Sequence, residues 1–168
     1  NESIMKHIED TPWWICDPEE TNYCTYSDTD SIYMHAEPLL RYRHENFDEM
    51  DAEEKDNALE AIAMEYEGVV TKSYDKLAKD VFRSTEHRLE MKTECVIRSA
   101  YFRATRRYAQ WITKQEGIVN ETLDVKGLEF KKANFPPVLG KFFKKALVDV
   151  LKGATQKEID DRLKIFKK

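Results

Sequence analysis

The chain has 168 residues, of which 41% are apolar and 35% are charged, a composition that suits one globular domain, or one domain and part of another. No run approaches the roughly 18 apolar residues of a membrane span, and residues 1–6 lack the basic-then-apolar pattern of a signal peptide. Cys16, Cys24 and Cys95 show no C-x-x-C spacing, which predicts reduced thiols in an intracellular protein rather than a disulfide framework.

Charge is spread unevenly along the chain. Residues 1–60 carry 4 Lys and Arg against 17 Asp and Glu, residues 61–100 carry 7 against 7, and residues 101–168 carry 16 against 8. The net charge of −5 therefore hides an acidic beginning and a basic end. Such asymmetry indicates an interaction surface, and an acidic protein can bind nucleic acid when its basic residues share one face.

The first half of the chain predicts a hairpin and a long helix. Residues 3–9 have the spacing of a helix end, which Thr11-Pro12 breaks. Residues 22–34 place two β-favouring runs around a polar turn, the pattern of a hairpin, and residues 36–50 predict an irregular acidic connector. From residue 52 to residue 82 apolar side chains recur at steps of three and four, so we expect a helix that Asp51 and Glu54 begin with a capping box. Gly68 is a candidate kink in it.

The second half predicts three strands and two helices. Residues 86–98, 104–113 and 118–130 favour strands, and a turn at residues 114–117 joins the last two. Apolar spacing turns helical from Pro137 to Lys152-Gly153, and Thr155 with Glu158 caps a final helix through Phe166. Taken in order, these elements predict an α+β fold.

Two aspartates lie one residue apart at the tip of the predicted hairpin. Alternate side chains of a strand point the same way, so Asp28 and Asp30 can aim two carboxylates at one point. Like charges this close repel each other unless a cation lies between them, and hard oxygen ligands suit Mg²⁺ or Mn²⁺. Asp, Ser and Thr also favour solvated turns, so Asp-x-Asp alone leaves both interpretations open.

Three segments carry a resemblance to a known family. Residues 26–31 read Tyr-Ser-Asp-Thr-Asp-Ser and resemble the Y-G-D-T-D-S motif, called motif C, of family B DNA polymerases. Residues 105–109 read Thr-Arg-Arg-Tyr-Ala and resemble the family's K-K-R-Y-A segment. Residues 126–136 are similar to its K-G-x-E-x-x-R-x-x-x-P segment at the palm-to-thumb junction. The segments occur in the family's order, the resemblance extends from residue 3 to residue 155, and bacteriophage enzymes are the most similar.

The resemblance implies a fold and an activity. Residues 1–135 would form the C-terminal part of a palm, an antiparallel sheet that contains the motif C hairpin plus further strands and is packed by helices. Residues 136–168 would begin an α-helical thumb. The activity implied is that of a DNA-directed DNA polymerase, which adds deoxynucleotides to a primer 3′-end by two-metal phosphoryl transfer. Asp30 is then the essential ligand of two Mg²⁺ ions, which Mn²⁺ can replace. Asp28 lies beside it, and both count as catalytic.

The resemblance also assigns the contacts with duplex DNA. Arg106, Arg107 and Tyr108 would lie along the primer strand, and lysines where the thumb begins would contact its backbone. Without the resemblance, exposed basic residues are routinely solvated, but their place in the basic third favours phosphate binding. The candidate DNA contacts are Arg106, Arg107, Tyr108, Lys126, Lys131 and Lys132.

Three positions bear on how well the family's pattern fits. Glu94 aligns with a family glutamate near the metal site, which makes it a further candidate metal ligand. Lys92 stands where many relatives have an acid, which puts this role in doubt. Ser27 replaces a glycine, at a modest cost if its φ is positive and at none if its backbone is extended.

The chain lacks two segments of the family. No D-x-x-S-L-Y-P, which supplies the other metal-binding aspartate, and no K-x-x-x-N-S-x-Y-G, which grips the nucleotide, occurs in it. We therefore expect a fragment that does not polymerise by itself. Loss of a sheet neighbour exposes a strand edge, which predicts that the fragment dimerises.

The implied partners are primer–template DNA, deoxynucleoside triphosphates and, as a candidate, a sliding clamp, with no membrane. The implied location is intracellular, and for a bacteriophage protein the host cytoplasm. Two other classes remain open. A metal-dependent glycosyltransferase also uses Asp-x-Asp, and a palm-like module could bind duplex nucleic acid without catalysis. The glycosyltransferase interpretation leaves the segments at Arg106 and Lys126 unexplained.

Overall fold

The computed structural model describes residues 23–28, 30–131 and 134–166. Within these residues the protein is an α+β fold, as predicted, with a two-stranded hairpin, a separate three-stranded antiparallel sheet and four α-helices. The hairpin therefore forms a sheet of its own, whereas the resemblance implies one palm sheet that contains it. The chain divides into two compact units, Asn1–Glu94 and Cys95–Lys168. The predicted palm–thumb boundary after residue 135 stays a prediction, and the predicted helix at residues 3–9 lies outside the described residues.

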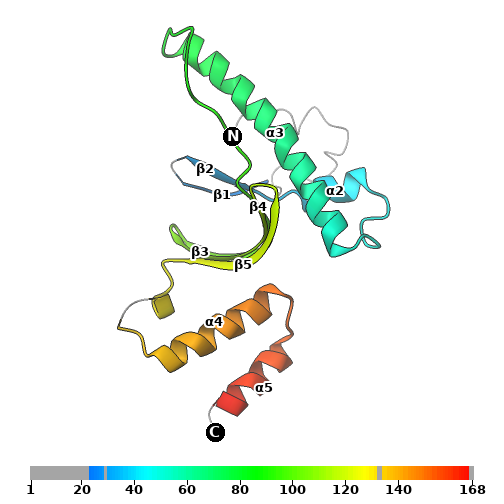
Figure 1. The fold of residues 1–168 in the computed structure, drawn as a ribbon, viewed down its shortest axis with the longest axis vertical. Helices are drawn as coiled ribbons and strands as arrows, with labels where there is room; N and C mark the ends of the chain where they lie inside the picture. The colour runs from blue at the N-terminus through cyan, green and yellow to red at the C-terminus, as the bar shows by residue number, and fades with distance from the viewer. Residues whose placement is uncertain (1–22, 29, 132–133, 167–168) are drawn as a thin grey trace. The chain divides into compact units, whose positions relative to one another are not determined.

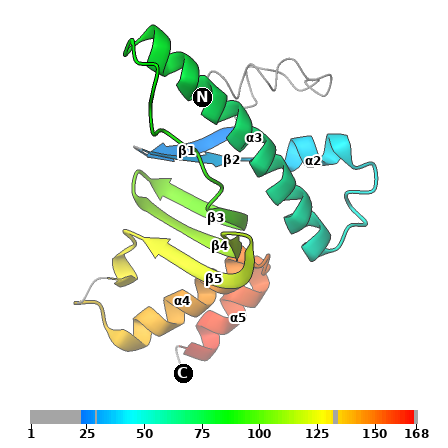
Figure 2. The same ribbon diagram turned by 45° about the horizontal axis from the view of Figure 1, so that its top comes forward.

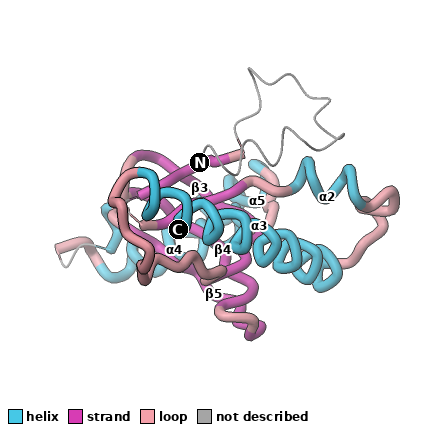
Figure 3. The backbone as a smooth tube through the Cα atoms, turned by 90° about the horizontal axis from the view of Figure 1, so that it is seen from above, coloured by secondary structure: helices cyan, strands magenta, loops and turns pink. Residues whose placement is uncertain are grey.

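The first unit is built from the predicted hairpin and helices packed against it (Figure 1). Strand β1 (Cys24–Asp28) pairs antiparallel with β2 (Ser31–Met34). Helix α2 (Glu37–Arg43) follows the hairpin, and a loop then turns the chain into α3 (Ala52–Asp80), as Figure 3 shows. The two helices are joined by Arg43, whose guanidinium donates to both carboxylate oxygens of Glu65 at 2.7 and 3.0 Å.

One apolar cluster holds this unit together. Helix α3 contributes Ile62, Tyr66 and Val70 to this cluster, at the spacing that the sequence predicted. They meet Leu39 and Leu40 of α2, which are 0% and 2% exposed. Burial raises the pKa of Tyr66 to about 12, so its ring stays neutral in the core. At the far end of the predicted stripe Val81 is 62% exposed, because the helix has ended at Asp80.

Helix α3 begins as its sequence predicts. The Asp51 carboxylate accepts from the Glu54 amide at 2.8 Å, and the Glu54 carboxylate accepts from the Asp51 amide at 2.8 Å. This reciprocal capping box satisfies two amides that the helix leaves unpaired. The helix continues without interruption past Gly68, so the candidate kink does not interrupt it.

The prediction of an irregular connector at residues 36–50 is wrong in its first half, where α2 forms. Acidic composition concealed a short amphipathic helix whose Pro38 lies in the first turn, where a missing amide costs nothing. Its residues Leu39 and Leu40 are buried against α3. Helices this short are stable only when packed, so the signal was tertiary.

The prediction of a strand at residues 86–98 is also wrong up to Glu94. Strand β3 spans Cys95–Ala104, and residues 83–94 form no strand. Instead, residues 84–93 run back along α3 (Figures 1 and 2) and make hydrogen bonds with its side chains, not with a neighbouring strand. Alternating side chains are a property of extended backbone in general, so the pattern could not tell a strand from this segment.

The second unit is a three-stranded antiparallel sheet with two helices on one side (Figure 2). The sheet order is β3, then β4 (Arg107–Gln115), then β5 (Ile118–Lys126). Residues 104–106 and 127–130 lie outside β4 and β5, which corrects the predicted bounds. A two-residue turn of Glu116 and Gly117, both with positive φ, joins β4 to β5; this backbone matches the twist of a hairpin.

Helix α4 (Pro137–Leu151) packs on one face of this sheet and α5 (Gln156–Phe166) follows it. Leu151 is buried against Ala109, Trp111 and Val125 of the strands. Lys152 reinforces the contact, since its Nζ lies 4.2 Å from the centre of the Trp111 ring and 3.5 Å from Glu121. A short 3-10 turn, η1 (Glu129–Lys131), connects β5 to α4. Among the described residues, no helix combines the length and hydropathy that crossing a bilayer requires.

Replacing Gly68 with alanine should stabilise the chain. A Cβ at Gly68 meets no atom within 4 Å, and glycine in a helix interior costs about 1 kcal/mol relative to alanine. We expect Gly68→Ala to raise the free energy of unfolding by about 0.5–1 kcal/mol in urea denaturation. An unchanged or lowered free energy of unfolding would contradict the open space around Gly68 from which the gain is expected.

Candidate functional site

The tip of the β1–β2 hairpin carries the two aspartates as predicted. Asp28 is the last residue of β1 and pairs with Ser31, the first residue of β2. The Ser31 hydroxyl donates to the Asp28 carbonyl at 3.1 Å, which closes the turn. Asp30 lies in the turn and is exposed, whereas Thr29 lies outside the described residues. The chain therefore presents both carboxylates within one tight turn.

Ser27 occupies this hairpin without strain. It lies in β1, and the described non-glycine residues with positive φ are Arg83, Arg106 and Glu116. The backbone at Ser27 is thus in a region open to any L-residue. The departure from glycine at this position carries no conformational cost.

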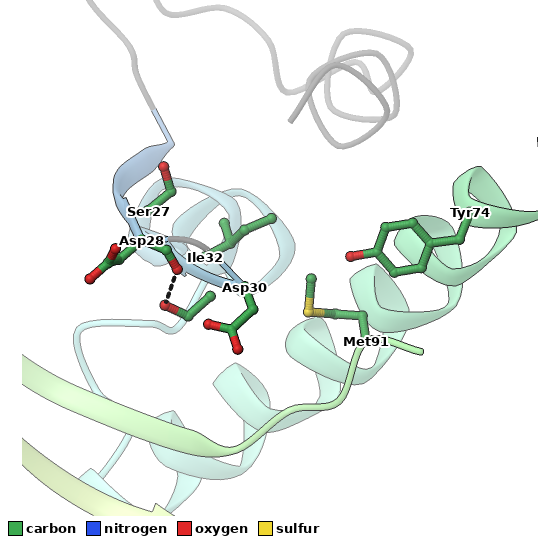
Figure 4. A pocket seen from close by; sticks show the side chains of 7 residues that line it. Ser27, Asp28, Asp30, Ile32, Tyr74 and Met91 are labelled. Carbon is green, nitrogen blue, oxygen red and sulfur yellow. Dashed lines mark hydrogen bonds between the residues drawn. The ribbon is translucent and has the colours of Figure 1, made fainter. Parts of the chain in front are cut away.

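The hairpin tip borders a hollow of about 230 Å³ in the first unit (Figure 4). Its walls come from three segments: the hairpin tip, the C-terminal part of α3 and the extended segment that follows α3. The lining residues are Ser27, Asp28, Asp30, Ser31, Ile32, Tyr74 and Met91. Oxygen-bearing side chains at the hairpin tip thus share one hollow with the apolar side chains of Ile32 and Met91 and the ring of Tyr74.

The two carboxylates differ in their surroundings. Asp28 is half-buried, and the Tyr26 hydroxyl lies 3.5 Å from its Oδ2. Tyr26 is itself held by an edge-to-face contact with Tyr33, with ring centres 5.4 Å apart. Figure 4 shows the carboxylates of Asp28 and Asp30 pointing in different directions, with that of Asp30 on the side of Met91. The expectation that strand alternation aims both at one point is therefore wrong here, because Asp28 ends β1 whereas Asp30 lies in the turn. Asp30 is therefore the more accessible of the two oxygen donors.

This donor set fits Mg²⁺ in kind. Carboxylate oxygens are the ligands that Mg²⁺ prefers, and it is often bound through one or two carboxylates with waters and phosphate oxygens completing its shell. Asp28 and Asp30 supply two such groups. Among residues 23–28, 30–131 and 134–166, no three His, Cys, Asp or Glu side chains converge as a metal-binding group. Glu94 is exposed and does not line the hollow, so the structure does not bring it together with the two aspartates there.

A second candidate site lies in the second unit, at the end of the sheet where β3 turns into β4. Ala104 pairs with Arg107 across this turn, and Arg106 within it has φ of 59°. The sequence placed Arg106 on a strand, but it lies in the turn. Tyr108 pairs with Lys126 of β5, and its ring lies 5.5 Å from that of Phe102. Four of the predicted DNA contacts, Arg106, Arg107, Tyr108 and Lys126, are thus gathered at one end of one sheet.

Gly127 joins two of the three segments that carry the family resemblance. It has φ of +61°, and a Cβ built on it would lie 2.2 Å from the Arg106 carbonyl oxygen. Only glycine lets the backbone after β5 approach the β3–β4 turn this closely. The residues around Arg106 and those around Gly127, separate in the sequence, therefore lie against each other at this end of the sheet.

The basic side chains of this surface are exposed at Arg106, Arg107 and Lys126, and Tyr108 is half-buried. The Arg107 guanidinium lies 3.9 Å from the Glu129 carboxylate. An exposed ion pair of this kind contributes little to the free energy of folding. Lys131 is the last residue of η1, and Lys132 lies outside the described residues.

Sequence reasoning missed Tyr74 and Met91. The apolar spacing of residues 52–82 predicts Tyr74 only as part of the core face of a helix, and the alternation of residues 86–98 predicts Met91 only as part of a strand. Both do pack against the core, but both also line the hollow beside Asp30. No local pattern distinguishes a core residue from one that also borders a cavity, because the difference depends on the segments that fold around it.

No protein-family model matches this chain, and no curated protein matches it either.

Gly127 and Gly153 offer a matched test of the contact between the two segments. Both have positive φ, but an added Cβ at Gly153 meets no atom within 4 Å. We expect Gly153→Ala to lower the free energy of unfolding by about 1 kcal/mol, the cost of left-handed backbone alone. Gly127→Ala should cost at least about 2 kcal/mol more, because the Arg106 carbonyl must also move. Chemical denaturation of both variants measures the difference; equal losses would contradict the close approach.

Proposed function

We propose that this chain is part of a family B DNA-directed DNA polymerase, with residues 1–135 from the palm and residues 136–168 from the start of the thumb. The observation that carries the proposal is the hairpin. Residues 26–31 resemble motif C, and they form a tight β-turn that presents Asp28 and Asp30 at its tip beside a hollow. A solvated turn explains the aspartates but not the hollow.

In the proposed enzyme Asp30 and Asp28 hold Mg²⁺. When bound, the metal pair activates the primer 3′-hydroxyl and stabilises the charge that develops on the transferred phosphoryl group. The exposed Asp30 carboxylate is the primary ligand. Asp28, half-buried with the Tyr26 hydroxyl 3.5 Å from its Oδ2, is the secondary one, because its carboxylate is the less exposed of the two. The remaining protein ligand would come from another segment of the polymerase.

The second unit supports the proposal through its charge. Arg106, Arg107 and Lys126 lie at one end of the sheet, in the part of the chain with 16 Lys and Arg against 8 Asp and Glu. Lysine and arginine that neutralise phosphates release counterions, so this surface suits a nucleic-acid backbone. A glycosyltransferase with an Asp-x-Asp site has no need of such a surface.

The decisive test is Asp30→Asn in the polymerase that contains this chain. Amide oxygen replaces a charged ligand at nearly the same volume, so nucleotide incorporation should fall by roughly a thousandfold or more while duplex binding stays nearly intact. Asp28→Asn should cost less. Asp80→Asn, an exposed aspartate at the end of α3, is the matched control and should be silent. An active Asp30→Asn enzyme would refute the assignment.

Salt dependence tests the basic surface in the 168-residue chain. We expect weak binding to a labelled primer–template duplex that falls steeply with salt, and no primer extension. Lys126→Gln should lower the slope of log K against log[salt] by about one, the signature of one lost phosphate contact. Lys157→Gln, an exposed lysine of α5, should leave the slope unchanged. Fluorescence anisotropy between 50 and 200 mM salt, a range of roughly fourfold, measures the slope for each variant and for the unchanged chain. Equal slopes for Lys126→Gln and the unchanged chain would show that Lys126 does not contact the DNA.

A further inference from the structure

The hollow beside Asp30 has an apolar wall that the metal chemistry does not use. Tyr74 reaches it from α3 and Met91 from the extended segment after α3. Figure 4 shows the Met91 side chain between Asp30 and the Tyr74 ring, with the Tyr74 hydroxyl on the Met91 side. Both residues and Ile32 also pack against the core of the first unit. The wall is therefore an extension of a packed core rather than a loosely placed surface.

The segment that carries Met91 is fixed to α3 at regular intervals. Glu67 accepts from the Thr93 amide at 2.8 Å, and the Thr71 hydroxyl lies 3.5 Å from the Met91 amide. Four helical residues rise about 6 Å and two extended residues span about 6.6 Å. Side chains one turn apart on α3 can therefore meet alternate amides of the segment.

A histidine completes this attachment. The Asp75 carboxylate lies 2.9 Å from Nε2 of His87, whose Nδ1 accepts from the Leu89 amide at 3.1 Å. Because Nδ1 is an acceptor, Nε2 carries the proton and donates it to Asp75. Glu67, Thr71 and Asp75, each four residues apart, thus define the line along which the segment lies. We call residues 84–93 the strap.

The hollow matches one part of a nucleotide. Asp28 and Asp30 offer oxygens to a metal ion that would hold a phosphate, and two serine hydroxyls lie beside them. Ile32, Met91 and Tyr74 offer an apolar surface in the same hollow. A volume of about 230 Å³ is below the range of about 300–1,000 Å³ that holds a whole small ligand. A sugar next to a phosphate fits this size and this division of polarity, whereas a phosphate alone would leave the apolar wall unused.

We propose that Tyr74 and Met91 contact the deoxyribose next to the metal-held phosphate, and that the strap, fixed by Glu67 and Asp75, sets the position of that contact. The inference rests on the proposed function and adds the sugar-contacting residues to it. Met91 packs its thioether on the sugar face, and Tyr74, which lines the hollow beside Met91, offers its hydroxyl to the sugar at the edge of that contact. Glu67 and Asp75 are positioning residues, since they act through Met91.

The contact is tested in the polymerase that contains the chain. We expect Met91→Ala to raise either the KM for deoxynucleotide or the Kd for primer–template by about tenfold, with kcat within about threefold. A rise in KM assigns the sugar to the incoming nucleotide, and a rise in Kd assigns it to the primer end. Met91→Leu should restore the value. Met64→Ala, which removes a methionine of α3 that is 64% exposed, should change neither.

The strap is tested without activity, by amide hydrogen exchange of the 168-residue chain. Glu67→Ala should speed exchange at the Thr93 amide by about tenfold or more, whereas Lys76→Ala, at an exposed site of the same helix, should not. In the polymerase, Glu67→Ala should reproduce the Met91→Ala defect, and the double variant should be no worse than either. Additive losses, or a Met91→Ala enzyme with unchanged KM and Kd, would overturn the inference.

The two proposals fail in different ways. An active Asp30→Asn polymerase removes the metal assignment. Unchanged KM and Kd in Met91→Ala, alongside an inactive Asp30→Asn, remove only the sugar contact. Circular dichroism melting of each variant confirms that it folds; if Met91→Ala does not fold, Tyr74→Phe, which removes only the hydroxyl, takes its place and should raise the same constant by about threefold.

Discussion

Burial of the apolar stripe of α3 is the interaction on which the first unit depends. Ile62, Tyr66 and Val70 are each no more than 6% exposed, and full burial of such side chains contributes about 1.5–3 kcal/mol apiece. The same contacts stabilise α2, which is too short to persist alone. They also support the hairpin, because Ile32 and Met34 of β2 pack on the cluster. A two-stranded hairpin needs such a surface to be stable in water.

This arrangement explains how two aspartates can occur one residue apart at the tip of the hairpin. The hairpin is anchored by its β2 face on the core, so the tip does not have to contribute to stability. Asp30 can then remain exposed and Asp28 half-buried, where water screens the repulsion between them. A metal ion would lower that repulsion further, and the apolar wall of Tyr74 and Met91 would limit the water that competes for it. The core thus provides both the support and the apolar boundary of the hollow.

The second unit shows the same division between support and surface. Leu151, Trp111 and Val125 form its core on one face of the sheet, while the basic residues gather at the sheet's end. Gly127 lies at this end of the sheet. Because it has no Cβ, the chain after β5 can approach the turn at Arg106 closely. Mixed charge also restrains this surface, because Glu129 lies near Arg107. Backbone geometry thus places the cations at this end of the sheet.

The sequence by itself determined the elements whose signals are local. The hairpin, the capping box of Asp51 and Glu54, the start and end of α4 and the turn at Glu116-Gly117 all follow from turn chemistry and from spacing along a few residues. It also singled out Asp28 and Asp30 as a pair. Only the tertiary structure decided that residues 37–43 are a helix and that residues 84–93 are a strap. Both depend on contacts with α3 that are distant in the sequence: Leu39 and Leu40 of α2 are buried against it, and the strap is held by hydrogen bonds to Glu67, Thr71 and Asp75. The same is true of Tyr74 and Met91, because a residue becomes the wall of a hollow only through the segments that fold around it.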